Sequence, residues 1–259
     1  MTGPVVILQS HRETGLPPWI GRCLDSVREW CAEHGHDYRF VGDEMLDLVP
    51  SAWRSATGRY PQIAADLGRL YLLRDALDTG AGTAFWLDAD VVVLDRAQFD
   101  PLIAGSHAFG REIWIESVSG GGFRARKNVH NAAIMMRPGN PVLAFYTHAA
   151  ERIVERLATD GGGDRVPPQI IGPKLLGGLH NIVGFPLIES VGMLSPPVLA
   201  DIAAGSDGAA LNCFRAHLEV PVRAVNLSAS LIDDDAVADA ALSRLLDDPE
   251  RLCPHRRPQ

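Results

Sequence analysis

Two aspartates two positions apart, at the end of an apolar segment, are the side chains best placed to do chemistry. Asp88 and Asp90 follow the apolar residues 83–87 and precede a second apolar run, residues 91–94. The edge where strands end is where α/β sheets bind ligands. Two unpaired carboxylates there would repel each other, so Mg²⁺ or Mn²⁺, which prefer oxygen ligands, is a natural partner and could neutralise a diphosphate. Equally open is a turn capped by one aspartate, with the other paired to an arginine.

A second pair of charged residues precedes this segment. Asp66 and Arg69 are three positions apart in the stretch that leads into Asp88, so in a helix they share one face. A helix that feeds directly into the Asp88 strand can aim both groups at the same cleft. A plain surface ion pair is the alternative on an isolated helix.

These groups need a scaffold, and the first half of the chain predicts one. Apolar segments with the length of buried strands alternate with segments whose apolar residues recur every three or four positions. We expect strands at residues 5–8, 38–41 and 83–87, and helices at residues 19–34 and from Pro61 to about residue 78. The order β-α-β-α-β predicts a parallel sheet with helices on its faces, in an α/β fold. Residues 42–60 give no clear assignment.

The second half has a different pattern. We expect short strands at residues 108–110 and 113–115, then an irregular basic loop over residues 119–127. A strand at 131–136 turns into a helix that reaches about residue 157, and a glycine-rich connection covers 159–168. Further expected elements are a helix from Gly172-Pro173, a turn region at 201–208, a strand at 222–227 and a capped helix at 233–246.

Composition excludes several classes. A chain of 259 residues, 46% hydrophobic and 22% charged, with net charge −8, predicts a globular domain, and its basic residues form no stripe that would bind nucleic acid or an anionic membrane. The four cysteines have no zinc-ligand spacing and predict reduced thiols. Without a signal-peptide pattern or a membrane-span pattern, the expected location is the cytoplasm. Oligomeric state is left open.

The charged segments resemble a known family. Residues 63–73 (IAADLGRLYLL) and 85–91 (FWLDADV) are similar to the DxD sugar-binding region of family 32 glycosyltransferases. Residues 131–134 with 138–141, residues 171–173 and residues 224–228 resemble later segments of that family, in the same order. Two features depart from it: the connection between Arg69 and Asp88 is longer, and Asn226 stands where the family usually has a histidine near the metal. His217 is an alternative to Asn226 for completing the metal site.

The resemblance implies a GT-A, Rossmann-like fold: a mixed, mainly parallel sheet flanked by helices in a single domain. The implied division is a glycosyltransferase domain at 1–232, made of a nucleotide-binding half (1–95) and an acceptor-side half (96–232), followed by a C-terminal helix and tail at 233–259. It also implies metal-dependent transfer of a sugar from a nucleotide diphosphate sugar, with UDP favoured, to an acceptor hydroxyl with retention at the anomeric carbon.

The implied site follows residue by residue. Asp90, Arg69 and Asp66 are expected to be catalytic, and Mn²⁺ or Mg²⁺ is expected on Asp88, Asp90 and Asn226. Arg69 and Asp66 would contact the donor sugar or phosphate. The residues expected to bind the donor are Gln9, Ser10, His11, Asp66, Arg69, Asp88, Asn131, Gly172 and Ser228.

The acceptor and the rival functions stay open. The acceptor would be a small molecule, a glycan or a protein, contacted by the loop at 119–127. A retaining enzyme needs no dedicated base, and none is assigned among Glu112, Glu116 and Glu189. Rival interpretations are a haloacid dehalogenase-type phosphatase that uses Asp88 and Asp90, with Lys174 and residues 233–235 as later elements, and a protein that binds sugar nucleotides without turnover. A nucleotidyltransferase is less consistent, because no glycine-rich nucleotide loop follows the first strand.

Overall fold

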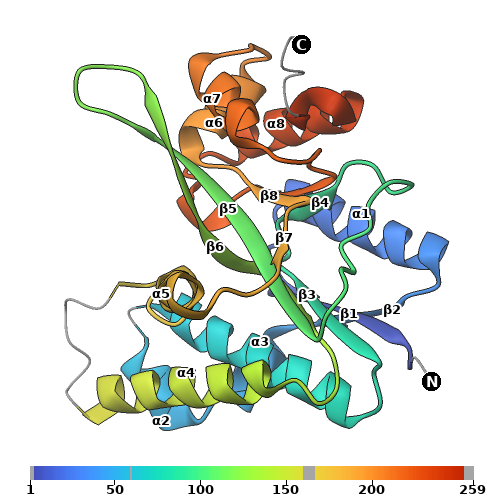
Figure 1. The fold of residues 1–259 in the computed structure, drawn as a ribbon, viewed down its shortest axis with the longest axis vertical. Helices are drawn as coiled ribbons and strands as arrows, with labels where there is room; N and C mark the ends of the chain where they lie inside the picture. Colours follow the sequence, from blue (N-terminus) through green and yellow to red (C-terminus); the bar gives the residue numbers. More distant parts are fainter. Residues whose placement is uncertain (1–2, 59, 160–166, 254–259) are drawn as a thin grey trace.

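A six-stranded mixed sheet forms the centre of the protein (Figure 1). The structure is a computed structural model that describes residues 3–58, 60–159 and 167–253. The strand order is β2-β1-β3-β6-β5-β7, in which β1 pairs parallel with β2 and β3, β6 runs antiparallel to β3 and β5, and β7 is parallel to β5. The strands are β1 (Val5–Ser10), β2 (Asp37–Val41), β3 (Thr83–Leu87), β5 (His107–Ser117), β6 (Phe123–Met136) and β7 (Leu187–Ile188).

A smaller sheet lies beside the C-terminal helices. It has the order β4-β9-β8, with β4 (Val91–Val93), β9 (Ala224–Asn226) and β8 (Val191–Met193). β9 pairs antiparallel with β4 and parallel with β8. Because β4 directly follows the Asp88–Asp90 turn, this sheet joins the end of β3 to the C-terminal part of the chain.

The helices cover both faces of the central sheet and one of its ends. They are α1 (Pro18–His34), α2 (Ser51–Ala56), α3 (Pro61–Asp78), α4 (Pro141–Thr159), α5 (Pro173–Val183), α6 (Pro196–Ala203), α7 (Ala209–His217) and α8 (Asp235–Asp247). Three short 3₁₀ helices are η1 (Asp43–Leu48), η2 (Ala229–Leu231) and η3 (Pro249–Leu252). In Figure 1, α2, α3 and α4 lie below the sheet and α6, α7 and α8 gather near the C-terminus. No helix in the described ranges is long and apolar enough to cross a membrane.

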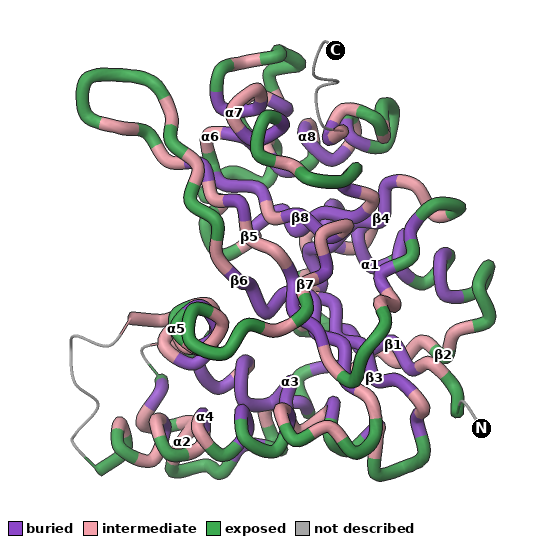
Figure 2. The backbone as a smooth tube through the Cα atoms, in the orientation of Figure 1, coloured by how far each residue is buried: buried purple, intermediate pink, exposed green. Residues whose placement is uncertain are grey.

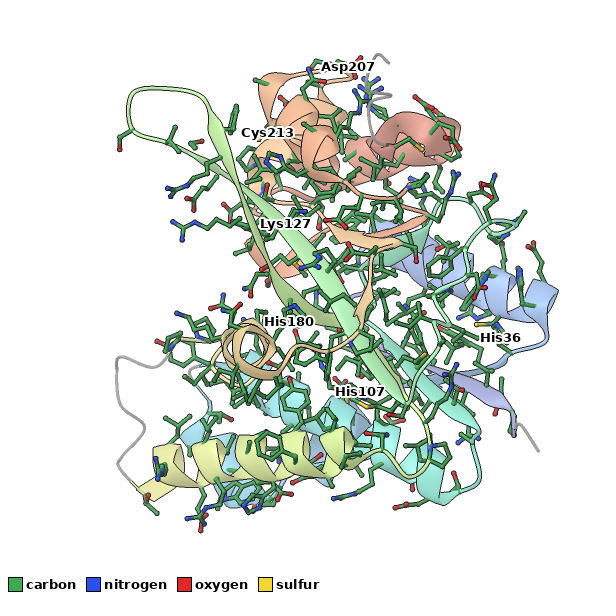
Figure 3. The ribbon with its side chains drawn as sticks, viewed as in Figure 1. His36, His107, Lys127, His180, Asp207 and Cys213 are labelled. Carbon is green, nitrogen blue, oxygen red and sulfur yellow. The ribbon has the colours of Figure 1, made fainter. Side chains whose placement is uncertain are left out.

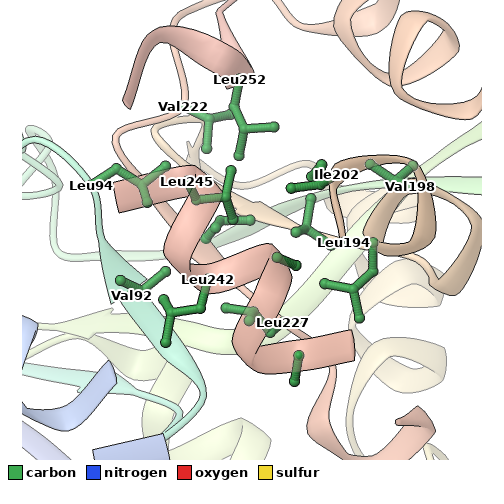
Figure 4. Packing of buried hydrophobic residues seen from close by; sticks show 14 of the residues in the cluster. Val92, Leu94, Leu194, Val198, Ile202, Val222, Leu227, Leu242, Leu245 and Leu252 are labelled. Atoms are coloured by element: carbon green, nitrogen blue, oxygen red, sulfur yellow. The ribbon is translucent and has the colours of Figure 1, made fainter. Parts of the chain in front are cut away.

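Successive side chains of a strand point to opposite faces of the sheet, and this produces separate apolar clusters. In β1, Val6 and Leu8 pack with α3 and α4, whereas Ile7 packs with α1 on the opposite face. The central strands are accordingly buried (Figure 2). A further cluster joins the smaller sheet to the C-terminal helices, where Leu242 and Leu245 of α8 meet Val92 and Leu227 (Figure 4). The mainly parallel, helix-flanked α/β fold expected from the sequence is confirmed.

The region from residue 107 to residue 136 corrects the prediction. Instead of two short strands and an irregular basic loop, β5 and β6 form one long antiparallel hairpin that projects from the body of the protein (Figure 1). Arg124, Arg126 and Lys127, expected in the loop, lie in β6. Only the tip is a turn, and Gly120, Gly121 and Gly122 adopt positive φ angles there that other residues rarely tolerate.

Three smaller expectations have separate outcomes. Part of the unassigned region 42–60 forms η1 and α2. The expected turn at 201–208 begins inside α6, whose start at Pro196 fits the fixed φ of proline in a first helical turn. The predicted connection at 159–168 lies mostly outside the described residues.

Candidate functional site

The Asp88–Asp90 turn is held from three directions. The Asp88 N–H donates to the Ala132 carbonyl of β6 at 2.9 Å, and the Leu227 N–H donates to the Asp90 carbonyl at 3.0 Å. The fully buried Gln9 side chain donates from Nε2 to the Asp88 carbonyl at 3.0 Å. The turn is therefore fixed by β1, β6 and the segment after β9. Gln9 supports the turn from inside the protein, and its contact with a donor stays a prediction.

Arg69 is the centre of a buried polar cluster at the end of β3. Its guanidinium nitrogens lie 3.1 Å from Asp66 Oδ1 and 3.1 Å from Asp88 Oδ1, and Nη1 donates to the Asn131 carbonyl at 2.7 Å. Asn131 Nδ2 in turn donates to Asp66 Oδ1 at 2.8 Å. The Arg69 side chain is 9% exposed, and within the described residues its buried Nε has no hydrogen-bond partner. The structure thus brings together four of the residues that the sequence singled out.

Two aromatic residues here were not selected from the sequence: Trp86, which belongs to the Arg69 cluster, and Tyr38, which contacts Gln9. Trp86 donates from Nε1 to Asp88 Oδ1 at 2.6 Å, and its ring lies 5.1 Å from the Arg69 guanidinium carbon. Tyr38 donates its hydroxyl to Gln9 Oε1 at 3.1 Å. The i, i+2 spacing of Trp86 and Asp88 is a signal that could have identified this contact, because such residues share one face of a strand.

An irregularity in the hairpin positions Asn131. The β5–β6 register pairs Phe109 with Ile134 but Gly110 with His130, so residues 131–133 of β6 have no partner in β5. This leaves the Asn131 carbonyl available to Arg69. Irregular pairing of this kind commonly re-aims side chains near functional sites.

Gly172 closes the cluster from the side of α5. A Cβ atom at this position would lie 2.9 Å from both Asp66 Oδ2 and Asn131 Nδ2. The Tyr146 hydroxyl donates to the carbonyl of the neighbouring Ile171 at 2.7 Å, and this hydrogen bond holds the backbone at Gly172 against Asp66 and Asn131. A side chain at Gly172 would therefore displace the Asp66 and Asn131 groups.

Asp90 belongs to a second hydrogen-bonded group, formed with the segment after β9. Asn226 Nδ2 donates to Asp90 Oδ1 at 2.5 Å, and the Ala229 N–H donates to Asp90 Oδ2 at 2.7 Å. Asn226 Oδ1 accepts from the Ser228 N–H at 2.7 Å, and Ser228 Oγ donates to the Leu194 carbonyl at 2.8 Å. Ser228 has φ of 58°, the one positive φ outside glycine among the described residues.

Burial raises the pKa of the Asp66 and Asp90 carboxyl groups, whereas the hydrogen bonds that these groups accept lower it. Burial raises the pKa of Asp66 to about 6, although the charge of Arg69 opposes the rise. Burial and then the charge of Asp88 raise the pKa of Asp90 to about 7, against hydrogen bonds from Ala229 and Asn226. Perturbed pKa values of this kind gather at functional sites.

Comparison with known proteins identifies the fold. No protein-family model matches the chain, and no curated protein matches it in sequence. A solved glycosyltransferase involved in the glycosylation of the major capsid of PBCV-1 superposes with a TM-score of 0.50 at 11% identity, over 93% of this chain and 100% of that chain. The fold is that of the GT-A glycosyltransferases. The resemblance to family 32 in particular stays a prediction.

Two other solved structures match at lower scores. Mouse xyloside xylosyltransferase 1 in its apo form has a TM-score of 0.42 at 10% identity, over 90% of this chain and 99% of that chain. An active-site mutant of LgtC has a TM-score of 0.39 at 11% identity, over 92% of this chain and 95% of that chain.

Within the GT-A fold, the acidic turn offers part of a cation site. Asp88 Oδ2 has no partner among the described residues, and each Asp90 oxygen accepts one hydrogen bond and retains a lone pair. Mg²⁺ is commonly held by one or two carboxylates, with waters and substrate phosphates as its other ligands. Two carboxylates at this turn fit that coordination. The described residues contain no cluster of three or more His, Cys, Asp or Glu side chains arranged to hold a metal on their own.

The two candidates for a third ligand are placed differently. The Asn226 amide nitrogen faces Asp90, and its oxygen accepts a hydrogen bond from the Ser228 N–H, so the amide must rotate before its oxygen can face a cation held by Asp90. His217 is exposed at the end of α7, and its ring nitrogen contacts the Cys213 carbonyl. Of the remaining donor-binding candidates, the Ser10 hydroxyl donates to the Gly42 carbonyl at 3.4 Å and the partly exposed His11 contacts the Arg12 carbonyl.

Proposed function

We propose that this protein transfers a sugar from a nucleotide diphosphate sugar to an acceptor hydroxyl. The observation that carries the proposal is the Arg69 cluster, in which a buried guanidinium joins Asp66, Asp88 and Asn131 at the end of β3, the position where α/β sheets receive ligands. The GT-A fold supports this class of reaction. By itself the fold does not identify the substrate.

The cluster has the groups needed to recognise a polar ligand. Asp66 and Asp88 hold the planar guanidinium of Arg69 in one orientation. Its Nε is a buried donor without a hydrogen-bond partner among the described residues. A fixed guanidinium suits a sugar oxygen or a phosphate. Asp66 has lone pairs that can accept hydrogen bonds from sugar hydroxyls. Ser10, His11 and Ser228 are proposed to contact the nucleotide and its phosphates.

Asp88 and Asp90 would hold Mn²⁺ or Mg²⁺, which supplies positive charge opposite the developing charge of the diphosphate leaving group. The protein's contribution is to keep the two carboxylates on one rigid turn, fixed by Gln9 and Leu227. Because that turn is fixed before a ligand arrives, no reorganisation is required at the moment of bond cleavage.

We propose transfer with retention. In a retaining reaction the departing phosphate can accept the acceptor proton on the same face, and no protein base is needed. Two of the three glutamates considered as bases are engaged: Glu116 pairs with Arg124 and Arg126, and Glu189 pairs with Arg111 at 3.0 Å. Neither is free to remove a proton.

The rival functions are less consistent with these contacts. A phosphatase that uses Asp88 and Asp90 would leave the buried pair of Arg69 and Asp66, which lie 3.1 Å apart, without a role. Asp88 also follows the third strand of the chain rather than the first. A protein that binds sugar nucleotides without turnover is separated from a transferase by the experiment below.

The test is a panel of sugar nucleotides, beginning with uridine diphosphate sugars, measured by thermal shift with and without Mn²⁺ and by release of nucleoside diphosphate. A ligand that binds only the folded state raises its melting temperature. Binding without release supports the non-catalytic protein, and orthophosphate release from a phosphomonoester supports the phosphatase. If none of the sugar nucleotides raises the melting temperature, the proposal is refuted.

Two variants localise the site. Asp90→Asn should abolish the Mn²⁺-dependent part of donor binding, whereas Asp239→Asn, on the exposed face of α8, should not. Arg69→Lys keeps the charge but removes the fork, so it should weaken intact sugar nucleotide at least about tenfold more than free nucleoside diphosphate. Equal losses for the two ligands would place Arg69 away from the sugar.

A further inference from the structure

Trp114, in the middle of β5, lies on the face of the hairpin that turns away from the apolar core. Its neighbours Ile113 and Ile115 are 4% and 1% exposed and pack against the C-terminal helices. Trp114 is only partly buried, belongs to none of the apolar clusters and has no hydrogen bond or ring contact among the described residues. A partly exposed tryptophan that lies outside the apolar clusters and makes no hydrogen bond is typical of a binding surface.

Polar side chains flank this tryptophan on the same face. The register places Glu112 opposite Asn128, Trp114 opposite Arg126 and Glu116 opposite Arg124. Arg126 donates from Nε to Glu116 Oε1 at 2.8 Å, and Arg124 bonds to the same carboxylate, so the charges of this part of the face are paired. The face therefore combines an aromatic ring with hydrogen-bonding groups and has little unpaired charge.

Glu112 is the exception, since it has no cationic partner in the described part of the chain. Its carboxylate bonds to the Asn128 amide, and burial raises the pKa of Glu112 to about 7. Asn128 is seated against α5 at Gly177, where an added Cβ would lie 2.2 Å from Asn128 Oδ1. Glycine at this position thus lets α5 approach the strand and hold the amide next to Glu112.

Two elements connect this face to the Arg69 cluster. β6 carries both Asn128 and Asn131, which are separated by roughly 10 Å of strand. α5 begins beside Asp66 at Gly172 and reaches Asn128 at Gly177. Figure 3 labels one residue on each of these elements, Lys127 on β6 and His180 on α5. Trp114 lies further along the hairpin, about 17 Å of strand from Asn131.

We propose that this face, formed by Trp114, Glu112 and Asn128, binds the acceptor and that the acceptor is an oligosaccharide or a glycan chain. An aromatic ring stacks on the apolar face of a sugar, and adjacent carboxylate and amide groups bond to its hydroxyls. The distance from the Arg69 cluster to Trp114 is longer than one sugar ring, which favours a chain over a monosaccharide. The inference rests on the proposed function, because it treats the Arg69 cluster as the donor site.

The test uses an array of defined oligosaccharides probed with the full-length protein in the presence of uridine diphosphate and Mn²⁺. We expect the protein to bind at least one class of saccharide on the array. Trp114→Ala should reduce this binding at least about tenfold, and Trp114→Phe should largely keep it. The matched control is Phe145→Ala, which removes an exposed aromatic ring on α4 that is 54% exposed. Far-ultraviolet circular dichroism and thermal unfolding verify that each variant is folded.

The outcomes separate the two proposals. If the unmodified protein is retained on no oligosaccharide, or if Trp114→Ala and Phe145→Ala behave alike, the acceptor site is wrong. Thermal stabilisation by sugar nucleotides, measured on the unmodified protein and on Trp114→Ala, reports on the donor site alone. Normal donor stabilisation with unaltered saccharide retention in Trp114→Ala refutes this inference and leaves the proposed function standing.

Discussion

Replacing Arg69 with methionine should destabilise the protein far more than removal of an ordinary ion pair. The Arg69 side chain is 9% exposed and lies 3.1 Å from both Asp66 and Asp88. Methionine fills similar volume but leaves two carboxylates without their cation and the Asn131 carbonyl without its donor. Breaking a buried pair by removal of one partner costs about 3–5 kcal/mol.

The comparison is Arg54→Met. Arg54 contacts Asp47 at 2.8 Å, a shorter distance than in the Arg69 pairs, but the two side chains are 39% and 72% exposed. Exposed pairs contribute about 0–1 kcal/mol. Free energies of unfolding from urea titrations at pH 7 measure both losses.

A second variant isolates the cause. Asp66→Asn combined with Arg69→Met removes one of the uncompensated charges, so the double variant should be more stable than Arg69→Met alone. The stability loss caused by Arg69→Met should also be smaller at pH 5 than at pH 7. The pKa of Asp66 is raised to about 6 even beside Arg69, and without the guanidinium the folded state takes up a proton more readily. A loss below about 1 kcal/mol for Arg69→Met would show that this cluster contributes no more than a solvent-exposed ion pair.

The remaining predictions concern the irregular part of the hairpin. A Cβ at Gly110 would lie 1.9 Å from His130 Cε1, so Gly110→Ala should cost at least about 2 kcal/mol of unfolding free energy. The control is Gly178→Ala, which has open space around it and should be neutral or stabilising. Equal urea midpoints of unfolding for the two variants would contradict this prediction. Burial lowers the pKa of His130 to about 4, so its neutral form is favoured in the folded state and the unfolded state binds the extra proton between about pH 6.5 and pH 4. Relative to His130→Asn, the protein should therefore lose about 3 kcal/mol of stability as pH falls through that range, and a difference independent of pH would show that His130 is accessible to protons when folded.

Much of the fold could be predicted because its strands are continuous apolar runs. Residues 5–8 and 83–87 become β1 and β3, and the apolar spacing of residues 19–34 becomes α1. Asp66 and Arg69 could be placed near Asp88 because a helix leading directly into a strand limits where its side chains can point. These inferences depend on local pattern and short connections.

The long hairpin could not be predicted for a physical reason. The outer parts of β5 and β6 have one face against the body and one exposed, and charged residues such as Arg124 and Arg126 on the exposed face resemble a loop in sequence. Their pairing with Glu116 is visible only once the register is known. The same holds for the contact of Asn226 with Asp90, which depends on a sheet that joins segments 136 residues apart.

The hydrogen bonds of Asp90 also bear on how the protein is synthesised. Its partners Asn226 and Ala229 lie 136 and 139 residues further along the chain. A nascent chain therefore carries an incomplete acidic turn until residues 226–229 have left the ribosome, although β1, α1 and β3 can already associate. Any ligand that needs the finished turn is excluded from partly synthesised chains. A truncation before residue 226, which removes β9 from the middle of the smaller sheet and Leu242 and Leu245 from its apolar cluster, should leave this corner unformed.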